Sequence, residues 1–280
     1  MGFYSASSIV RDAQAHGVEI FEPSVVHSDW DCILVGPAER PSVRLGLRMI
    51  RGLGEPVGRA IEQARGQASF RDLDDLIRRT ELRKNVVEAL AEAGALEEIV
   101  QGRRNALWRA RAPRAGPLFE QHPVQESEIE LPPLRPAEQL VLDYARVGLS
   151  VHDHPLRHLR AGLDRRRVLR TEELPGITSG KRIAVAGVVL NRQAPMTASG
   201  VVFMTIEDET GTANVILWKN VFEGYRHTAV NAKLLLVEGK VETREGTTHV
   251  LASRLERLDT PRQAEEAPLG GLRARSRDFC

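Results

Sequence analysis

A change in the spacing of apolar residues near Lys181 constrains the fold of this 280-residue chain more than any other feature. Before it, apolar residues recur at helical spacing; after it, β-branched and polar residues alternate as they do in strands. The alternation predicts strands at 183–190, 201–206, 213–218, 232–242 and 247–258, with a short helical connector at 220–225. Three strands, a helix and two strands is the order of an OB-fold barrel. The predicted fold class is α+β, with a helical region followed by a five-stranded OB-fold β-barrel.

The helical region contains a Gly-apolar-Gly turn, Gly52-Leu53-Gly54, between two segments of helical spacing. Pro56 marks the start of the second helix, because the N–H that proline lacks is not needed there. The glycines are expected to allow positive φ, and the free N–H groups at the helix start favour a phosphate. This is the pattern of a helix-hairpin-helix element, which holds nucleic-acid phosphates without reading a base. A plain αα-hairpin with a tight glycine turn is the alternative.

A second helical hairpin and a basic stretch follow. Ser69 is expected to cap the next helix, with Asp72 reaching back in a capping box. The turn of this second hairpin lacks glycine, so we interpret it as structural. The basic stretch surrounds Trp108 and contains Arg103, Arg104, Arg109, Arg111 and Arg114. Two interpretations stay open for it: an arm that follows phosphates, or a solvated helix face.

Composition excludes several classes of protein. Cys32 and Cys280, the only cysteines, can form neither a disulfide framework nor a zinc cluster. No apolar run approaches the ~20 residues that a membrane span requires, and the N-terminus lacks the features of a signal peptide. The sequence therefore predicts a cytoplasmic protein with no membrane partner.

Candidate catalytic groups are few. Asp29 and Asp31 on a predicted strand would point to one side, as a metal-dependent phosphoryl-transfer site requires. No third carboxylate lies nearby in sequence, so a solvated strand face beside buried Trp30 and Cys32 is the favoured interpretation. No nucleophile, base and orienting group occur at usable spacing. We therefore assign no catalytic residue and no metal ligand to this chain.

The barrel supplies a second group of candidate binding residues. OB barrels bind single strands with a basic groove and stacking aromatic side chains. Phe203 and Trp218 are candidates for stacking and equally for the barrel core, and Arg192 is among the basic residues expected on exposed positions. The candidate DNA-binding residues of the whole chain are Arg51, Gly52, Gly54, Val57, Arg59, Lys84, Lys181, Arg192, Trp218, Lys219, Tyr225 and Lys240.

Several separate blocks of the sequence resemble bacterial C-family DNA polymerases, of the DNA polymerase III α-subunit type. They are Met1-Gly2-Phe3-Tyr4-Ser5, Ser28-Asp29-Trp30-Asp31-Cys32, Arg44-Leu45-Gly46-Leu47 leading into Gly52-Leu53-Gly54, and Val237-Glu238-Gly239-Lys240-Val241-Glu242. The chain ends soon after the barrel, which resembles the error-prone branch. The resemblance implies the C-terminal portion only, because the palm and its catalytic carboxylates lie upstream in that family. Met1 then looks like an internal Met of a longer protein, and the chain is expected not to polymerise alone.

The resemblance and the composition together divide the chain. The expected parts are 1–43, the end of a fingers-like region; 44–112, a tandem helix-hairpin-helix DNA-binding domain; 113–136, a Pro-rich linker; 137–178, a helical connector; 179–259, an OB-fold nucleic-acid-binding domain; and 260–280, a flexible basic tail.

The function that the resemblance implies is that of the DNA-binding part of an error-prone, damage-induced translesion polymerase. The first hairpin would hold phosphates of the primer-template duplex, and the barrel would contact the single-stranded template. Mg²⁺ is implied for the full-length enzyme, and a sliding clamp and accessory mutagenesis proteins are implied as partners. A stand-alone module that binds single-stranded nucleic acid and an OB-fold protein-interaction scaffold are the alternatives.

Overall fold

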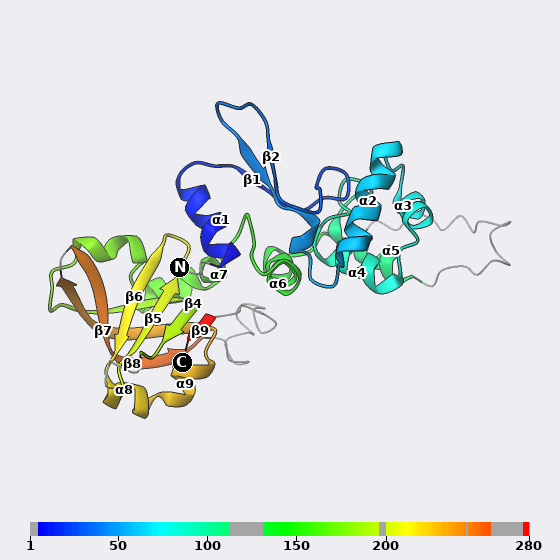
Figure 1. The fold of residues 1–280 in the computed structure, drawn as a ribbon. Coiled ribbons are helices and arrows are strands. Elements are labelled where there is room, and N and C mark those ends of the chain that lie inside the picture. Colours follow the sequence, from blue (N-terminus) through cyan, green and yellow to red (C-terminus); the bar gives the residue numbers. More distant parts are fainter. Residues whose placement is uncertain (1–4, 113–130, 196–199, 245, 259–276, 280) are drawn as a thin grey trace. The chain divides into compact units, whose positions relative to one another are not determined.

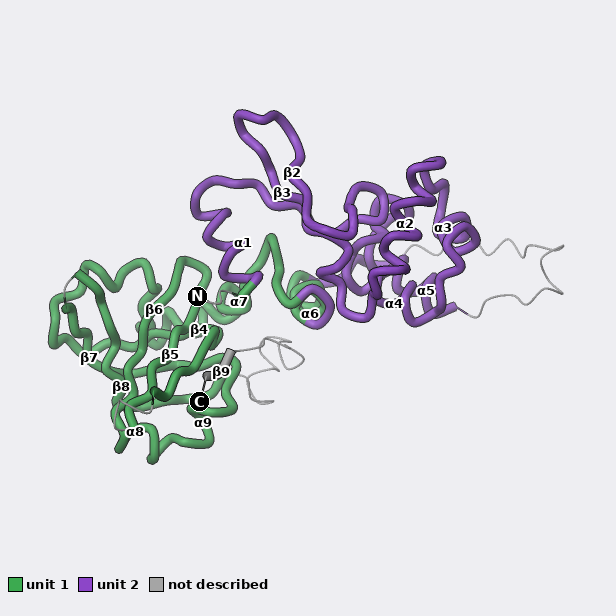
Figure 2. The backbone as a smooth tube through the Cα atoms, in the orientation of Figure 1, with its two compact units in different colours: residues 1–5, 136–144, 148–280 green, residues 6–135, 145–147 purple. Residues whose placement is uncertain are grey.

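The computed structural model describes residues 5–112, 131–195, 200–244, 246–258 and 277–279 (Figure 1). The chain forms two compact units, shown in different colours in Figure 2. The first, here called the helical unit, comprises residues 6–135 and 145–147. The second, the barrel unit, comprises residues 1–5, 136–144 and 148–280. Most of the predicted Pro-rich linker, residues 113–130, lies outside the described residues.

The helical unit begins with a helix and a small sheet, and continues as a series of helices. Its elements are α1 (Ala6–Ala15), β1 (Ile20–Phe21), β2 (Ile33–Val35), β3 (Ser42–Arg44), the 3₁₀ helix η1 (Leu47–Met49), α2 (Glu55–Gln67), α3 (Leu73–Thr80), α4 (Lys84–Glu92) and α5 (Arg103–Arg111). The strands are ordered β1-β3-β2, with β1 and β3 parallel. Apolar side chains spaced along the helices form its core, among them the fully buried Leu47, Ile61, Leu76 and Leu90.

Three local expectations in this unit are wrong. Asp29 and Asp31 precede β2 rather than lying on a strand, and Cys32 is exposed rather than buried. The N-cap of α3 is Asp72, whose carboxylate accepts a hydrogen bond from the Asp75 amide, so Ser69 does not cap this helix. A carboxylate placed directly before the helix can satisfy one of its free amides, and the more distant Ser69 is not needed for it.

The predicted basic stretch forms α5, which packs against α4. Arg103 is buried, and its Nε donates to the backbone carbonyl of Glu92 at 3.1 Å. Trp108, on the same helix, is 58% exposed. Arg103 is therefore a packing residue of the helical unit, and Arg114 lies outside the described residues.

The barrel unit confirms the predicted order of strands. Its elements are α6 (Pro136–Arg146, the last two residues of which belong to the helical unit), α7 (Pro155–Arg165), the 3₁₀ helix η3 (Thr171–Gly176), β4 (Arg182–Gln193), β5 (Val202–Glu207), β6 (Thr212–Leu217), α8 (Lys219–Gly224), α9 (Arg226–Asn231), β7 (Leu234–Arg244), β8 (Thr247–Arg257) and β9 (Arg277–Phe279). The strands are ordered β5-β6-β8-β7-β4, and pairing of β4 with β5 closes the barrel. Strands β6 and β8 are parallel, and the other pairs of the barrel are antiparallel. This is a five-stranded OB-fold barrel.

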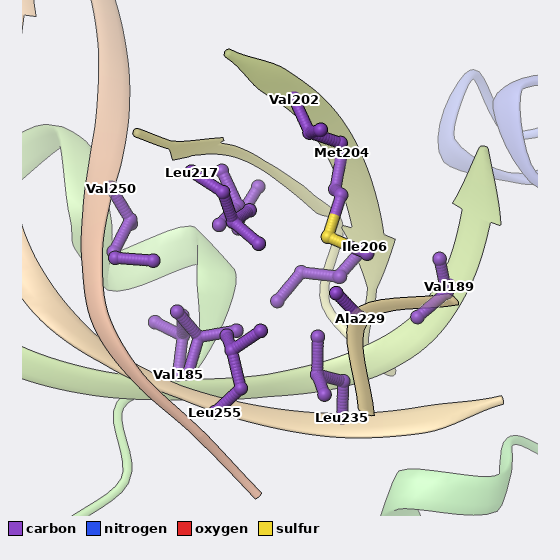
Figure 3. Close-up of a cluster of buried hydrophobic side chains, with 14 of the residues drawn as sticks. Val185, Val189, Val202, Met204, Ile206, Leu217, Ala229, Leu235, Val250 and Leu255 are labelled. Carbon is purple, nitrogen blue, oxygen red and sulfur yellow. The ribbon is translucent and has the colours of Figure 1, made fainter. Parts of the chain in front are cut away.

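Apolar side chains from all five strands fill the barrel (Figure 3). Val185, Met204, Leu217 and Val250 point inward from their strands, as the alternation predicts. A second apolar layer joins the outside of the barrel to α6 and α7. It contains Leu140, Tyr144, Leu156, Leu163, Ala186, Val188, Leu234 and Leu236. Most residues of α6 and α7, which lie in the predicted connector, therefore belong to the barrel unit.

The described residues of the predicted flexible tail form strand β9. Strand β9 pairs in parallel with Asn191–Gln193 of β4. Arg277–Phe279 of the predicted flexible basic tail thus form a strand, while residues 259–276 lie outside the described residues. Over the described part of the chain, no helix combines the length and the apolar composition that crossing a bilayer requires.

Candidate nucleic-acid interface

The glycine turn joins η1 to α2 within the helical unit. The first of the two predicted helices is thus a 3₁₀ helix of three residues, not an α-helix. Gly52 has φ of +95°, a value that strongly favours glycine. Gly54 has φ of −89° and is the N-cap of α2, so the expectation of positive φ is wrong for it. A Cβ added at Gly54 would meet only the Pro56 Cδ, at 3.8 Å. The fold therefore requires glycine at position 52 but not at position 54.

The backbone amides of this turn differ in availability. The Val57 amide donates to the Gly54 carbonyl at 3.1 Å, so the expectation that it is free for a phosphate is wrong. The amides of Gly52, Gly54 and Glu55 have no acceptor among the described residues. These three amides, at the positive end of the α2 dipole, are the donors that a phosphate could use.

The candidate basic residues of the helical unit all contact protein acceptors. Arg51 Nη1 donates to the Ala145 carbonyl at 3.1 Å. Lys84 Nζ donates to the Arg111 carbonyl at 2.8 Å, at the end of α5, while its side chain remains exposed. Arg51 and Lys84 therefore support neighbouring segments of this unit.

Arg59 lies one turn into α2 among carboxylates. It pairs with Glu62 at 3.2 Å, with Glu55 at 3.4 Å and with Asp31 at 3.5 Å. The hydrogen bond that Arg59 donates to the Glu62 carboxylate, followed by the charge of Glu62 and the contacts with Glu55, raises the pKa of the Arg59 guanidinium. Half of this side chain remains exposed, so a phosphate would compete with carboxylates for it.

Asp29 and Asp31 are partners of the hairpin arginines. Asp29 pairs with Arg65 at 2.7 Å, and Asp31 pairs with Arg48 as well as with Arg59. Within the described ranges, no group of three or more His, Cys, Asp or Glu side chains is placed to hold a metal ion. The residues described here therefore do not fit a magnesium site, and no step involving a metal ion is derived from them.

Sequence reasoning missed the role of Trp30 in shaping the hairpin. A Cβ at Gly58, in the first turns of α2, would lie 2.4 Å from Cε3 of the Trp30 ring. The indole ring therefore packs directly on the α2 backbone, where only glycine fits. The short spacing of Gly54 and Gly58 along α2 was the available signal for such close packing.

The candidate aromatic residues of the barrel unit separate into exposed and packed ones. Phe203 and Trp218 are 38% and 52% exposed, so neither is a core residue. The inward neighbours Val202 and Met204 turn Phe203 outward on β5, and Trp218 lies beyond the end of β6 as the N-cap of α8. Tyr225 is partly buried and packs against the barrel core.

Strands β5, β6 and β8 present one continuous outer face. Their register pairs Phe203 with Ile216 and Ile216 with Leu251 in one row. The next row contains Thr205, Asn214 and His249 in the same register. These six residues, here called the outer face, are all partly or well exposed. Exposed Lys240 on β7 continues the first row beside Leu251. An aromatic ring, two aliphatic side chains and polar groups thus lie together beside a lysine.

Arg192 is buried, and the expectation that it is exposed is wrong. It is 7% exposed, and its Nε donates to the Ala229 carbonyl at 2.6 Å while Nη2 donates to the Ala232 carbonyl. An irregularity in the β4–β5 register between Val189 and Asn191 shifts the alternation by one residue. This shift turns Arg192 inward, opposite Met204, where it satisfies carbonyls at the end of α9. Lys181 and Lys219 are exposed as expected.

Two domain families match this chain. A helix-hairpin-helix motif matches residues 17–106, and an OB-fold nucleic acid binding domain matches residues 183–258. The second match coincides with the five barrel strands, and the first includes the glycine turn. These matches support nucleic-acid binding by the two regions that the sequence singled out.

Several error-prone DNA polymerases match this chain over its whole length. An error-prone DNA polymerase of Pseudomonas paraeruginosa is 44% identical, and one of Alkalilimnicola ehrlichii is 42% identical; each match covers 100% of this chain and 27% of the relative. Among solved structures, asparaginyl-tRNA synthetase from Pyrococcus horikoshii is 26% identical over 32% of this chain and 22% of that chain, with a TM-score of 0.28. The chain is therefore homologous along its whole length to the C-terminal portion of error-prone DNA polymerases, with a helix-hairpin-helix region followed by an OB-fold domain.

Proposed function

We propose that this chain is the DNA-binding part of an error-prone DNA polymerase. Its barrel holds the single-stranded template on the outer face, and its glycine turn holds phosphates of the primer-template duplex. The observation that carries the proposal is the exposure of Phe203 on β5, in register with Ile216 and Leu251 and followed by Lys240. An aromatic ring on a strand face gives a base a surface on which to stack, and a cation beside it attracts the phosphates.

The outer face has the composition that single-strand binding needs. Phe203 is 38% exposed although its burial inside the barrel would be favourable, and the strand alternation keeps it outside. Asn214 and His249 in the neighbouring row supply hydrogen-bonding groups at the same surface. Strands at these positions of an OB fold, the second and third, are those on which oligonucleotides bind. Trp218 and Lys219, directly after β6, extend the candidate surface.

The glycine turn is the candidate for the duplex backbone. Amides of Gly52, Gly54 and Glu55 point out of the turn without an acceptor among the described residues. The space beside Gly54 is open, which allows another backbone to approach it. Amides contact phosphate oxygens without reading sequence, as a polymerase requires of its grip on a duplex.

The activity of the whole polymerase belongs to the same proposal. The chain spans 27% of the length of the two relatives named above, so nucleotidyl transfer with Mg²⁺ would depend on residues outside it. Translesion synthesis, and a sliding clamp and accessory mutagenesis proteins as partners, follow from the resemblance to that polymerase branch. A cytoplasmic location is proposed from the composition of the chain.

A salt titration tests the proposal. Binding of primed-template DNA and of single-stranded DNA of equal length is measured by fluorescence anisotropy at increasing salt. We expect tighter binding of the primed template and a steep fall, with a log–log slope of about −0.9 per neutralised phosphate on duplex. Equal affinity for both DNAs would indicate a stand-alone single-strand module. A flat slope or no binding would indicate a protein-interaction scaffold.

A substitution on the outer face tests the carrying observation. Phe203→Ala should weaken single-strand binding about 10-fold, which corresponds to the loss of one stacked base. Val230→Ala is the matched control, because Val230 is an exposed apolar residue of the same unit that lies on α9. Equal effects of the two substitutions would overturn the role of the outer face.

A further inference from the structure

A cavity of about 350 Å³ lies in the barrel unit, and none of the six outer-face residues lines it. It is bounded by the end of α7, the first residues of β4 and the middle of β7 and β8. Its lining includes Arg166, Arg167, Val168, Arg182, Leu236 and Glu238. The volume is in the range of small-molecule sites in proteins.

Two of the charged groups in the lining already have partners. Arg166 makes a two-pronged contact with Glu256, at 3.0 and 2.6 Å. Glu238 pairs with Arg254 at 3.6 Å. Each of these pairs is neutral overall. The electrostatic potential in the cavity therefore depends on the two remaining arginines, Arg167 and Arg182.

Arg167 and Arg182 supply the unpaired charge. Both are exposed, and neither side chain has a hydrogen-bond or ion-pair partner among the described residues. Two guanidinium groups that line one cavity without a carboxylate partner form a positively charged site. Val168 and Leu236, both buried, give the same cavity an apolar floor.

The backbone at Arg167 adds an independent observation. The Arg167 amide donates to the Asp164 carbonyl at 2.9 Å, and the Val168 amide donates to the Leu163 carbonyl at 3.0 Å. These two bonds form a Schellman motif, in which the residue with positive φ is usually glycine. Arg167 occupies that position with φ of +58°. The chain thus places an arginine where the local backbone favours glycine, and its side chain lines the cavity.

We propose that this cavity binds a phosphate monoester carried by a group of nucleotide size, with Arg167 and Arg182 contacting the phosphate. A monoester carries a charge of about −1.5 to −2 at neutral pH, which two guanidinium groups match better than they match the single charge of a phosphodiester. Guanidinium groups also contact phosphate oxygens in a bidentate manner. The apolar floor can accept the sugar or base. This chemistry occurs in a free nucleoside monophosphate and at the terminal phosphate of a DNA strand.

Binding of two probes to the full chain tests this site. One probe is thymidine 5′-monophosphate, followed by isothermal titration calorimetry. The other is a single-stranded oligonucleotide with and without a 5′-phosphate, followed by anisotropy. We expect at least one of two results: the mononucleotide binds, or the 5′-phosphate increases the affinity for the oligonucleotide. The probe that responds identifies whether the phosphate comes from a free nucleotide or from a DNA end. Absence of both effects would overturn the proposal.

Three variants link the effect to the cavity. Arg167→Gly and Arg182→Gln should each reduce the phosphate-dependent binding at least 10-fold. Arg165→Ala removes the same charge from an exposed position beside the cavity that does not line it, and should change binding less than twofold. Arg167→Gly relieves positive φ and should unfold at the same or a higher temperature, so its loss of binding cannot result from unfolding. Wild-type binding by Arg167→Gly would overturn the assignment.

The outer face provides a further control. Phe203→Ala should leave mononucleotide binding intact, because Phe203 does not line the cavity. The expected result is loss of single-strand binding with retained phosphate binding. The single-strand role of the outer face and the phosphate site in the cavity can therefore be refuted separately.

Discussion

The indole ring of Trp30 occupies the place that a side chain at position 58 would need. A Cβ at Gly58 would lie 2.4 Å from the ring atom Cε3 and 2.9 Å from Cζ3. Trp30 precedes the small sheet strands β2 and β3, whereas Gly58 belongs to α2. This contact packs the start of α2 against the segment that carries Asp29 and Asp31. Asp29 pairs with Arg65 and Asp31 pairs with Arg59, so the same contact helps to position both ion pairs.

Gly58→Ala should destabilise the helical unit. Within a helix, alanine normally stabilises by about 0.5–1 kcal/mol relative to glycine. Here the added methyl group would overpack against Trp30, and overpacking costs about 1–3 kcal/mol. The rigid indole ring has no flexible end that could move away from the methyl group. We expect a net loss of about 1–2 kcal/mol in the free energy of unfolding, measured by urea denaturation. In a Trp30→Ala background, Gly58→Ala should lower the free energy of unfolding less than it does in the wild type. Unaltered stability of Gly58→Ala would contradict the contact.

Gly54→Val should weaken duplex binding without unfolding the protein. The residue has φ of −89° and open space around its Cβ position, so the fold tolerates a side chain there. A β-branched side chain beside the turn amides would keep a phosphate away from them. We expect primed-template affinity to fall about 10-fold, with an unchanged circular dichroism spectrum. If affinity is unaltered, the turn has no part in duplex binding.

Trp218→Ala should give a folded barrel with weaker single-strand binding. The indole is 52% exposed and lies outside the core, so its removal costs little packing. Thermal unfolding followed by circular dichroism checks the fold, and anisotropy checks the binding. A large fall in unfolding temperature would instead indicate a packing role for Trp218.

Arg192→Ala should destabilise the barrel whether or not DNA is present. The side chain is 7% exposed and donates to the carbonyls of Ala229 and Ala232. Its removal would leave these carbonyls without their donor, at a cost of about 2–4 kcal/mol. Lys219→Ala, at an exposed position of the same unit, is the control and should be nearly neutral. A stable Arg192→Ala protein would show that water replaces the guanidinium.

Acid should destabilise the helical unit through Asp75. Burial would raise the pKa of this carboxyl, but the hydrogen bond from the Arg71 amide and the guanidinium of Arg79 outweigh it, so the pKa is lowered. A lowered pKa in the folded state contributes stability above the unfolded-state pKa of about 3.9, and this contribution disappears as pH falls through the folded value. The free energy of unfolding, measured from pH 6 to pH 2, should therefore decline more below about pH 4 in wild type than in Asp75→Asn. Parallel curves for the two proteins would contradict the linkage.

The succession of a helical region and a barrel, and the order of the barrel strands, could be predicted from the amino-acid sequence alone. Alternation over 183–258 has a direct physical meaning, since successive side chains of a strand point to opposite sides and one side must be apolar to close a barrel. The glycine turn was also readable, because Gly52 and Pro56 act through their own backbone. Such local signals need no knowledge of what packs against them.

Which side chains are available for binding could not be predicted, because this depends on contacts between distant segments. A register irregularity after Val189 turned Arg192 inward, and the partners of Asp29, Asp31 and Arg51 come from segments that are distant in sequence. The alignment of Phe203 with Ile216 and Leu251, and the cavity around Arg167, likewise depend on strands and helices far apart in the chain. The physical reason is that periodicity specifies the side of an element on which a residue lies, whereas burial and charge neutralisation depend on which distant segment meets that side.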